Sequence, residues 1–433
     1  MSDLIAAIAT GSTATAIGIV RVSGTGCFAA CDRVFRPRNG VPFAQQPSHK
    51  MVFGEMLDDS GAVIDQGLAV RFGGGHSYTG EDSAEFHCHG SPVVLHTLLS
   101  ALFAAGARQA QAGEFTKRAF LNGKMDLTEA EAVIDLIDAQ SAAAAKNAAA
   151  QLDGGLRRRL EPVQEALIDI TSRFYAVVDY PDEDIEDIQP QQIRSSLQIA
   201  ADTLSALLDT AQRGRVLKNG VRTAIVGLPN AGKSSLLNAL AGYDRAIVTD
   251  IPGTTRDTVE ETVTCGGLLL RLIDTAGLRD SDDPIEQLGV ERSRAAMDEA
   301  ALVLLVVDGT EKATREDADL ARAIAGTGKP WVLVRSKGDL AGENADDLAA
   351  LAEGAPLVSL SARTGEGLDE LGRAVEELFP KGTEDKAGEL ITNARQAEAA
   401  GRALDCVVRA GQALTDGVTP DALLTDVEEA LAT

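Results

Sequence analysis

Five short runs of apolar residues mark the chain between residues 221 and 360. Each run is almost continuously apolar, and stretches with helical spacing lie between most of them. Strands that are apolar on both faces belong to a parallel sheet with helices on each side. The pattern predicts an α/β domain with a mostly parallel sheet. The expected strands are Thr223–Val226, Leu268–Ile273, Leu302–Val307, Trp331–Val334 and Leu357–Leu360.

The segments around this domain have different patterns. Gly-rich turns and short alternating runs such as Ala16–Val22 predict a small α+β domain at the N-terminus. Helical spacing then begins near Leu127 and returns over Ala394–Leu414. We therefore predict a multidomain α+β and α/β chain. Its parts are an N-terminal α+β domain (1–118), a helical domain in two pieces (119–215 and 380–433) and an inserted α/β domain (216–379).

Composition narrows the class of protein. The 40 Lys and Arg residues against 65 Asp and Glu give a net charge of −25, which repels phosphate backbones at long range. An aromatic content of 4% disfavours nucleic-acid binding by base stacking. Five scattered cysteines indicate a reducing compartment, and no apolar run approaches the roughly 18 residues of a membrane helix. With its acidic Met-Ser-Asp start, the sequence predicts a cytoplasmic protein without a membrane partner.

A glycine-rich motif directly follows the first apolar run. Gly227-Leu-Pro-Asn-Ala-Gly-Lys-Ser234 has the spacing of a P-loop, with a predicted strand before it and a predicted helix, Ser235–Leu240, after it. Backbone N–H groups and the helix N-terminus favour phosphate there. We expect Lys233 to reach the β- and γ-phosphates in catalysis and Ser234 to ligate Mg²⁺. The expected nucleotide contacts are Asn230, Ala231, Gly232, Lys233, Ser234 and Ser235.

Three further motifs follow later apolar runs. They are Asp274-Thr275-Ala276-Gly277, Ser336-Lys337-Gly338-Asp339 and Ser361-Ala362-Arg363. Asp274 can hold the Mg²⁺ water shell, and the Gly277 N–H can sense a γ-phosphate. Asp339 can accept hydrogen bonds from the N1–H and 2-amino groups of guanine, which adenine cannot supply. A backbone N–H of the third motif can meet guanine O6. Because open α/β sheets bind ligands at the carboxyl ends of strands, the set predicts GTP.

The guanine motif departs from the pattern Asn-Lys-x-Asp that GTPases usually carry. Ser336 stands in place of the Asn. A hydroxyl is shorter than an amide and can lose one hydrogen bond of about 1 kcal/mol. We expect guanine specificity to persist through Asp339 while the affinity for GTP falls.

A candidate switch segment lies between the P-loop and Asp274. It contains Thr249, Asp250, Ile251, Pro252, Gly253, Thr254 and Thr255, which we expect to contact GTP. In a GTPase such a segment becomes ordered around the γ-phosphate and Mg²⁺. Thr255 is the candidate Mg²⁺ ligand. The alternative interpretation is an ordinary turn rich in Thr and Gly.

These motifs resemble the bacterial tRNA-modification GTPase family MnmE, also called TrmE. The resemblance includes the P-loop Gly-Leu-Pro-Asn-Ala-Gly-Lys-Ser-Ser, the switch Gly-Thr-Thr-Arg-Asp and Asp-Thr-Ala-Gly-Leu-Arg. It extends to His76-Ser-Tyr-Thr-Gly-Glu-Asp82, His87-Cys-His-Gly90 and Gly113–Asp126, so that it covers residues 1 to about 410. The family's fold is a GTPase domain inserted in a helical domain, preceded by a dimerisation domain that binds 5-formyltetrahydrofolate or a related one-carbon folate.

The resemblance implies an activity and partners. Members of the family are K⁺-activated GTPases that form homodimers. With a flavin-dependent partner protein, MnmG (also GidA), they assemble into a heterotetramer or larger complex. That complex adds an aminomethyl or carboxymethylaminomethyl group to the wobble uridine of certain tRNAs. The matching K⁺ ligands are Asn230, Thr249, Ile251 and Thr254, and the matching folate-binding residues are Arg21, Glu85 and Lys124.

The sequence lacks the glutamine that activates water in many GTPases. The position after Asp-Thr-Ala-Gly, where many GTPases carry a Gln that orients water, is Leu278. A K⁺ ion between the phosphates could supply the positive charge of an arginine finger. The carboxylate that the family uses on water matches Glu286. Without the resemblance, Glu286 would read as a solvated surface residue.

The end of the sequence differs from the family. The family finishes with Cys-x-Gly-Lys, whereas this sequence stops at Glu-Glu-Ala-Leu-Ala-Thr433. Cys406 precedes Val-Val-Arg within a predicted helix and does not take the place of the terminal Cys. A second function class therefore stays open beside tRNA modification, namely a switch GTPase of ribosome or RNA-complex assembly without modification chemistry of its own.

Overall fold

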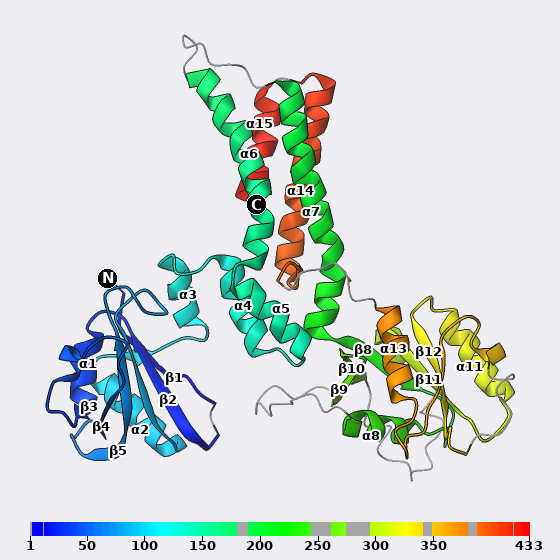
Figure 1. Cartoon of the computed structure of the whole chain (residues 1–433), viewed down its shortest axis with the longest axis horizontal. Coiled ribbons are helices and arrows are strands. Elements are labelled where there is room, and N and C mark those ends of the chain that lie inside the picture. Colours follow the sequence, from blue (N-terminus) through cyan, green and yellow to red (C-terminus); the bar gives the residue numbers. More distant parts are fainter. Residues whose placement is uncertain are drawn as a thin grey trace. The chain divides into compact units, whose positions relative to one another are not determined.

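The structure is a computed structural model that describes residues 2–11, 13–179, 189–243, 261–273, 295–340, 349–379, 388–418 and 420–433 (Figure 1). The chain divides into two compact units, Met1–Val133 and Ile134–Thr433. Each unit is described by itself below. The three boundaries between the four segments expected from the sequence stay a prediction.

The first unit contains a seven-stranded sheet in the order β3-β4-β5-β6-β2-β1-β7. Its strands are β1 (Ile5–Ile8), β2 (Thr15–Ser23), β3 (Phe35–Pro37), β4 (Val52–Leu57), β5 (Val63–Phe72), β6 (Ser83–Gly90) and β7 (Arg108–Gln109). The helices α1 (Cys27–Val34) and α2 (Pro92–Ala104) pack on the sheet, and α3 (Glu114–Leu121) follows. The next helix, α4 (Leu127–Ile137), begins in the first unit, and its residues from Ile134 onward belong to the second. Phe35, Phe43 and Phe86 pack together in the core of the first unit. This is the α+β fold that the alternating runs predict.

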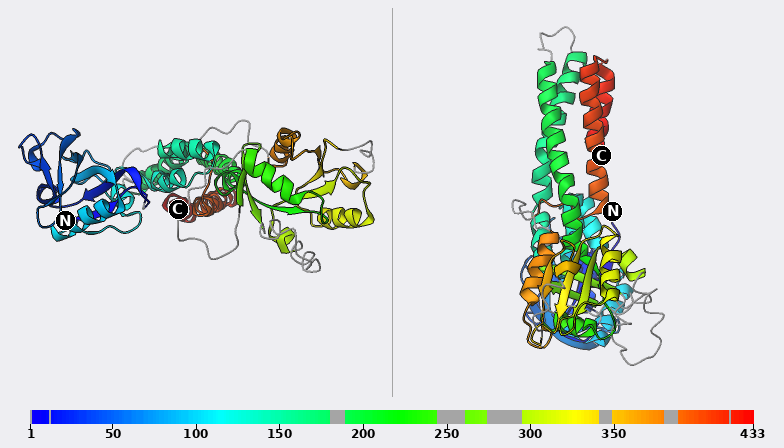
Figure 2. Two further views of the ribbon diagram at one scale, coloured as in Figure 1. Left: turned by 90° about the horizontal axis from the view of Figure 1, so that it is seen from below. Right: turned by 90° about the vertical axis from the view of Figure 1, so that its right-hand side faces the viewer.

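Packed helices form one part of the second unit (Figure 2). They are α5 (Ala142–Leu152), α6 (Gly155–Asp179), α7 (Pro190–Asn219), α14 (Ala394–Asp416) and α15 (Pro420–Ala432). α14 packs against both α7 and α15, and α6 packs against α7 and α15. Segments from before and after the α/β part therefore share one core, which includes Leu204 and Val407. The predicted insertion of the α/β domain into a helical domain is confirmed.

Buried polar contacts join the two ends of the inserted segment to the helices. Asp135 at the end of α4 accepts a hydrogen bond from Thr392 at 2.8 Å and pairs with Lys218 of α7 at 2.7 Å. The Gln151 amide donates to the Leu390 carbonyl at 2.6 Å. A buried carboxylate needs partners, and Asp135 finds them both near the end of α7, where the chain leaves the helices, and just before α14, where it returns.

The α/β part of the second unit holds a six-stranded sheet in the order β13-β12-β11-β8-β10-β9. Its strands are β8 (Val221–Val226), β9 (Glu261–Cys265), β10 (Leu268–Ile273), β11 (Leu302–Asp308), β12 (Trp331–Ser336) and β13 (Leu357–Ser359), and its described helices include α8 (Lys233–Tyr243), α11 (Arg315–Ala325) and α13 (Leu368–Leu378). All pairings are parallel except β9 with β10. The predicted mostly parallel sheet is confirmed.

The five cysteines are buried free thiols. Cys406 lies within α14, where burial raises the pKa of its thiol. Arg409 donates to the Cys406 sulfur at 3.2 Å. None of the helices that the structure describes is long and apolar enough to cross a membrane.

A two-glycine contact allows the β9–β10 hairpin to approach α13. Gly266 has φ of 60°, and a Cβ there would lie 2.2 Å from the Gly372 carbonyl oxygen. We expect Gly266→Ala to lower the free energy of unfolding of this domain by about 2 to 5 kcal/mol, through left-handed strain and forced separation of the two backbones. Denaturant unfolding followed by the fluorescence of Trp331, the single Trp of the chain, measures it.

Gly328 supplies the matched control for this substitution. Its φ is 68°, but a Cβ there would meet no atom within 4 Å. Gly328→Ala should therefore show only the backbone strain of about 1 to 2 kcal/mol. Equal losses in the two variants would contradict the steric role of the glycine contact.

Candidate functional site

The parallel sheet gathers the predicted nucleotide residues at one edge. β8 lies between β10 and β11, and later strands extend the sheet on each side of it. This is a topological switch point, at which open α/β sheets bind ligands beyond the carboxyl ends of their strands. The P-loop follows β8, the guanine motif follows β12, and the Ser361 motif follows β13.

The P-loop adopts a tight conformation that its glycines permit. Gly232 has φ of 101° and Asn230 has φ of 60°, which places two residues of the loop in the left-handed region. A Cβ on Gly227 would lie 2.2 Å from the Val306 carbonyl oxygen of β11. Only glycine therefore lets the loop start this close to the neighbouring strand.

The Lys233 ammonium reaches back over the loop at the N-terminus of α8. It donates to the carbonyl oxygens of Gly227 at 2.9 Å and Leu228 at 2.8 Å. Burial lowers the pKa of Lys233, because removal from water disfavours the charged form. A cation held by backbone carbonyls over a glycine-rich loop is placed to meet phosphate oxygens.

Asp339 is held as a charged acceptor by two donors. Its Oδ2 accepts from Arg363 Nη2 at 2.7 Å and Nε at 3.1 Å, and its Oδ1 accepts from the Ser361 hydroxyl at 2.7 Å. The Arg363 guanidinium, and then the Ser361 hydroxyl, hold the pKa of Asp339 below its usual value. The carboxylate still has lone pairs for further donors. Two of the predicted guanine motifs are therefore in direct contact.

Ser336 joins the guanine motif to the P-loop. It is buried at the end of β12, and its hydroxyl donates to the Ala231 carbonyl at 2.6 Å. Ser234 and Ser235 are the second and third residues of α8, and Ala362 lies between the two residues that contact Asp339. The structure thus brings together the described members of three predicted motifs.

Asp308 is a site residue that the sequence analysis missed. It is the last residue of β11, and its Oδ2 lies 2.5 Å from the Lys337 ammonium. Burial raises the pKa of this carboxyl, but hydrogen bonds from Lys337 and Thr310 outweigh burial and lower it. An Asp directly after the buried run Leu302–Val307 was the available signal. This ion pair fixes the side chain that follows Ser336.

Several predicted residues lie outside the part of the chain that the structure describes. They are Thr249, Asp250, Ile251, Pro252, Gly253, Thr254 and Thr255 of the switch, Asp274, Thr275, Ala276 and Gly277 of the second motif, and Glu286. β10 ends at Ile273, directly before the second motif. Their roles stay predictions.

Arg21 and Glu85 form a second polar cluster, in the first unit. They stand opposite each other on β2 and β6, and the guanidinium lies 2.8 Å from the carboxylate. Tyr78 and Phe115 lie beside the Arg21 guanidinium, with ring centroids 5.4 and 5.6 Å from its carbon. Lys124 is exposed, and its side chain passes close to Gly80. The cluster thus combines a cation, a carboxylate and two aromatic rings.

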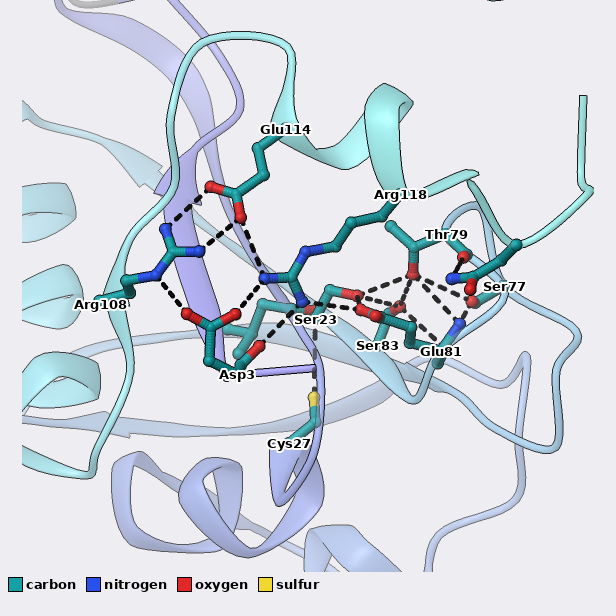
Figure 3. A network of polar contacts seen from close by, with 12 residues as sticks. Asp3, Ser23, Cys27, Ser77, Thr79, Glu81, Ser83, Arg108, Glu114 and Arg118 are labelled. Carbon is teal, nitrogen blue, oxygen red and sulfur yellow. Dashed lines mark hydrogen bonds and ion pairs between the residues drawn. The ribbon is translucent and has the colours of Figure 1, made fainter. Parts of the chain in front are cut away.

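A polar network around the buried Arg118 supports residues 77–82, the loop that carries Tyr78 (Figure 3). Arg118 donates to Glu81 at 3.0 Å, to Glu114 at 3.0 Å and to the Asp3 carboxylate at 2.7 Å. Glu81 also accepts from Ser23 at 2.9 Å. Because a buried guanidinium is costly to leave unpaired, these bonds tie the N-terminus, β2 and α3 to the 77–82 loop.

The sheet, the glycine-rich loop and the helix that follows it define a P-loop GTPase. The family described as MnmE helical domain matches residues 127–433, and the family described as GTP-binding protein TrmE N-terminus matches residues 4–124. The tRNA modification GTPase MnmE of Roseiflexus sp. (strain RS-1) is 43% identical over 99% of this chain and 93% of its own length. That of Symbiobacterium thermophilum is 42% identical over the same shares. This chain belongs to the MnmE family.

The geometry of Asp339 predicts how nucleotide choice can be changed. A carboxylate accepts from the guanine 2-amino group, whereas an amide can donate to the 2-oxo group of xanthine. We expect Asp339→Asn to weaken GTP binding by at least about ten-fold, the effect of a charged hydrogen bond, and to improve the relative binding of xanthosine triphosphate. Titrations with both nucleotides measure this. An unchanged ratio of the two affinities would reject Asp339 as the base-reading residue.

Proposed function

We propose that this chain is a K⁺-activated GTPase that takes part in tRNA modification. With a flavin-dependent partner it would add an aminomethyl or carboxymethylaminomethyl group to the wobble uridine of certain tRNAs. The observation that carries the GTPase part of the proposal is that the P-loop with Lys233 and the guanine motif with Asp339 lie at one edge of the mostly parallel sheet. The Ser336 hydroxyl joins the two motifs through its hydrogen bond to Ala231. The match of the two family models to residues 4–124 and 127–433 supports the tRNA assignment.

The proposed chemistry of GTP hydrolysis is mainly electrostatic. Phosphoryl transfer spreads negative charge over the phosphate oxygens, so that positioned cations lower the barrier. Lys233 would exchange its two carbonyl acceptors for phosphate oxygens. Ser234 and Thr255 would hold Mg²⁺, which would supply positive charge to the phosphates. Asp274 would hold the water shell of this ion.

Potassium would supply the further charge that this sequence lacks. Leu278 cannot orient water, so we propose that Glu286 does, while K⁺ compensates the developing charge. Asn230 is exposed in the left-handed part of the P-loop, which supports its role as a K⁺ ligand. Thr249, Ile251 and Thr254 would complete the site. In this proposal the switch segment and the P-loop hold one ion between them.

The first unit would bind 5-formyltetrahydrofolate and form a homodimer. The chemistry of the Arg21 cluster supports the folate assignment. Glu85 can accept from the N–H groups of a pterin ring, and Tyr78 and Phe115 offer faces or edges to a planar ring. Arg21 and Lys124 are cations suited to the carboxylates of a folate tail.

The potassium proposal makes the steady-state GTPase rate depend on the cation. We expect kcat to be at least about ten-fold higher in KCl than in NaCl of equal ionic strength, because Na⁺ is too small to contact all ligands of a K⁺ site. Asn230→Ala should remove the difference while retaining the NaCl rate. Equal rates of the unchanged protein in both salts would sink the potassium proposal.

The folate proposal has a matched control in the same sheet. Arg21 pairs with Glu85, and Arg36 pairs with Glu55 across β3 and β4 at 3.2 Å. We expect Arg21→Ala to weaken 5-formyltetrahydrofolate binding by about ten-fold or more, because a charged hydrogen bond is lost, and Arg36→Ala to leave it unchanged. Calorimetric titration of both variants decides the matter. Identical effects would place the ligand elsewhere.

A further inference from the structure

The Ser336 hydroxyl has one hydrogen, and that hydrogen is already used. Its oxygen lies 2.6 Å from the Ala231 carbonyl oxygen of the P-loop. A carbonyl carries no hydrogen, so the hydroxyl must be the donor in this bond. Toward any other group, Ser336 then presents only oxygen lone pairs.

Packing around Ser336 holds this arrangement. The residue is 5% exposed, and a Cβ on Gly232 would lie 3.1 Å from the hydroxyl oxygen. On the other side, the Gly309 N–H donates to the Ser336 carbonyl at 3.1 Å. The buried side chain therefore packs against the P-loop, while the backbone of Ser336 is held by the turn after β11. Turning the hydroxyl away would leave the Ala231 carbonyl without this donor, which costs about 1 to 3 kcal/mol when the group is buried.

The charged donors near Ser336, Lys337 and Arg363, are already paired with carboxylates. Lys337 lies 2.5 Å from the Asp308 carboxylate, and Arg363 holds Asp339 with two nitrogen atoms. Of the polar side chains that follow β12 and β13, those of Ser361 and Arg363 converge on the Asp339 carboxylate. That group accepts hydrogen bonds and does not donate them.

Guanine presents two kinds of edge to such a site. The N1–H and 2-amino groups are donors and suit Asp339, whereas N7 is an acceptor and needs a donor. An Asn amide has two hydrogens and could serve both a carbonyl and N7, but a hydroxyl that donates to Ala231 cannot. We propose that this chain recognises guanine through its N1 and 2-amino edge and does not read N7. The inference rests on the proposed GTP site.

The test compares GDP with 7-deaza-GDP, in which a C–H group replaces N7. Calorimetric titration with Mg²⁺ should give dissociation constants within about two-fold of each other, because no hydrogen bond is lost. Ser336→Asn adds a second donor and should create a preference for GDP of about five-fold, the effect of one neutral hydrogen bond. Ser336→Ala should weaken both nucleotides equally. Each comparison uses one preparation, so a partly unfolded variant still gives a valid ratio.

The outcomes separate this inference from the function on which it rests. If the unchanged protein bound 7-deaza-GDP about five-fold more weakly than GDP, while preferring GDP to ADP, N7 would be read and the inference alone would be overturned. An Asn variant that stayed indifferent to N7 would overturn the assignment to Ser336. Binding of GDP no better than ADP would overturn the proposed function and this inference with it.

Discussion

Parallel pairing of β8 with both β10 and β11 is the constraint on which the site depends. Parallel strands end at the same edge, so the loops after β8, β11, β12 and β13 meet there whatever their distance along the chain. The register places Asp308 opposite Ser336. Strands with fully buried apolar residues such as Leu304 and Val332 make this pairing rigid. That rigid edge supports left-handed backbone at Asn230 and Lys337.

Hydrogen bonds and an ion pair between the loops then fix the positions of the polar groups at this edge of the sheet. Ser336 bonds to Ala231, Ser361 bonds to Asp339, and Lys337 pairs with Asp308. Each bond joins segments that are far apart in the sequence. Together they hold a carboxylate acceptor and a P-loop in fixed relation before a ligand arrives, which reduces the ordering cost of binding. The first unit repeats this strategy, with Arg118 holding the loop beside Arg21.

The sequence predicted the parts of this fold that depend on burial. The run Leu268–Ile273 is a strand over the same residues, and all its side chains except Arg271 are apolar. Trp331–Val334 continues to Ser336, since hydrogen bonding to β11 extends past the last apolar residue. β9 was missed, because this antiparallel edge strand is only partly buried and carries polar residues. Its pairing partner, not its own pattern, makes it a strand.

Local patterns also could not show which polar side chains would meet. Arg363 was expected only within a motif that offers a backbone N–H to guanine, yet its side chain clamps Asp339, 24 residues earlier in the chain. Asp308 was not predicted as a site residue, because its partner Lys337 follows a different strand, β12. Motif spacing predicts which residues follow each strand, but the order of strands in the sheet decides which of them are neighbours.

The proposed function requires that GTP bound at this edge of the sheet drives tRNA modification. A reconstituted reaction with the chain, a flavin-dependent partner, tRNA, the folate and K⁺ tests it most directly, with wobble uridine analysed by mass spectrometry of digested nucleosides. We expect modified uridine when GTP is present. We expect none when GDP replaces GTP or when the Lys233→Ala substitution removes the P-loop cation. Modification that proceeds equally without GTP, or with the Lys233→Ala variant, would contradict it.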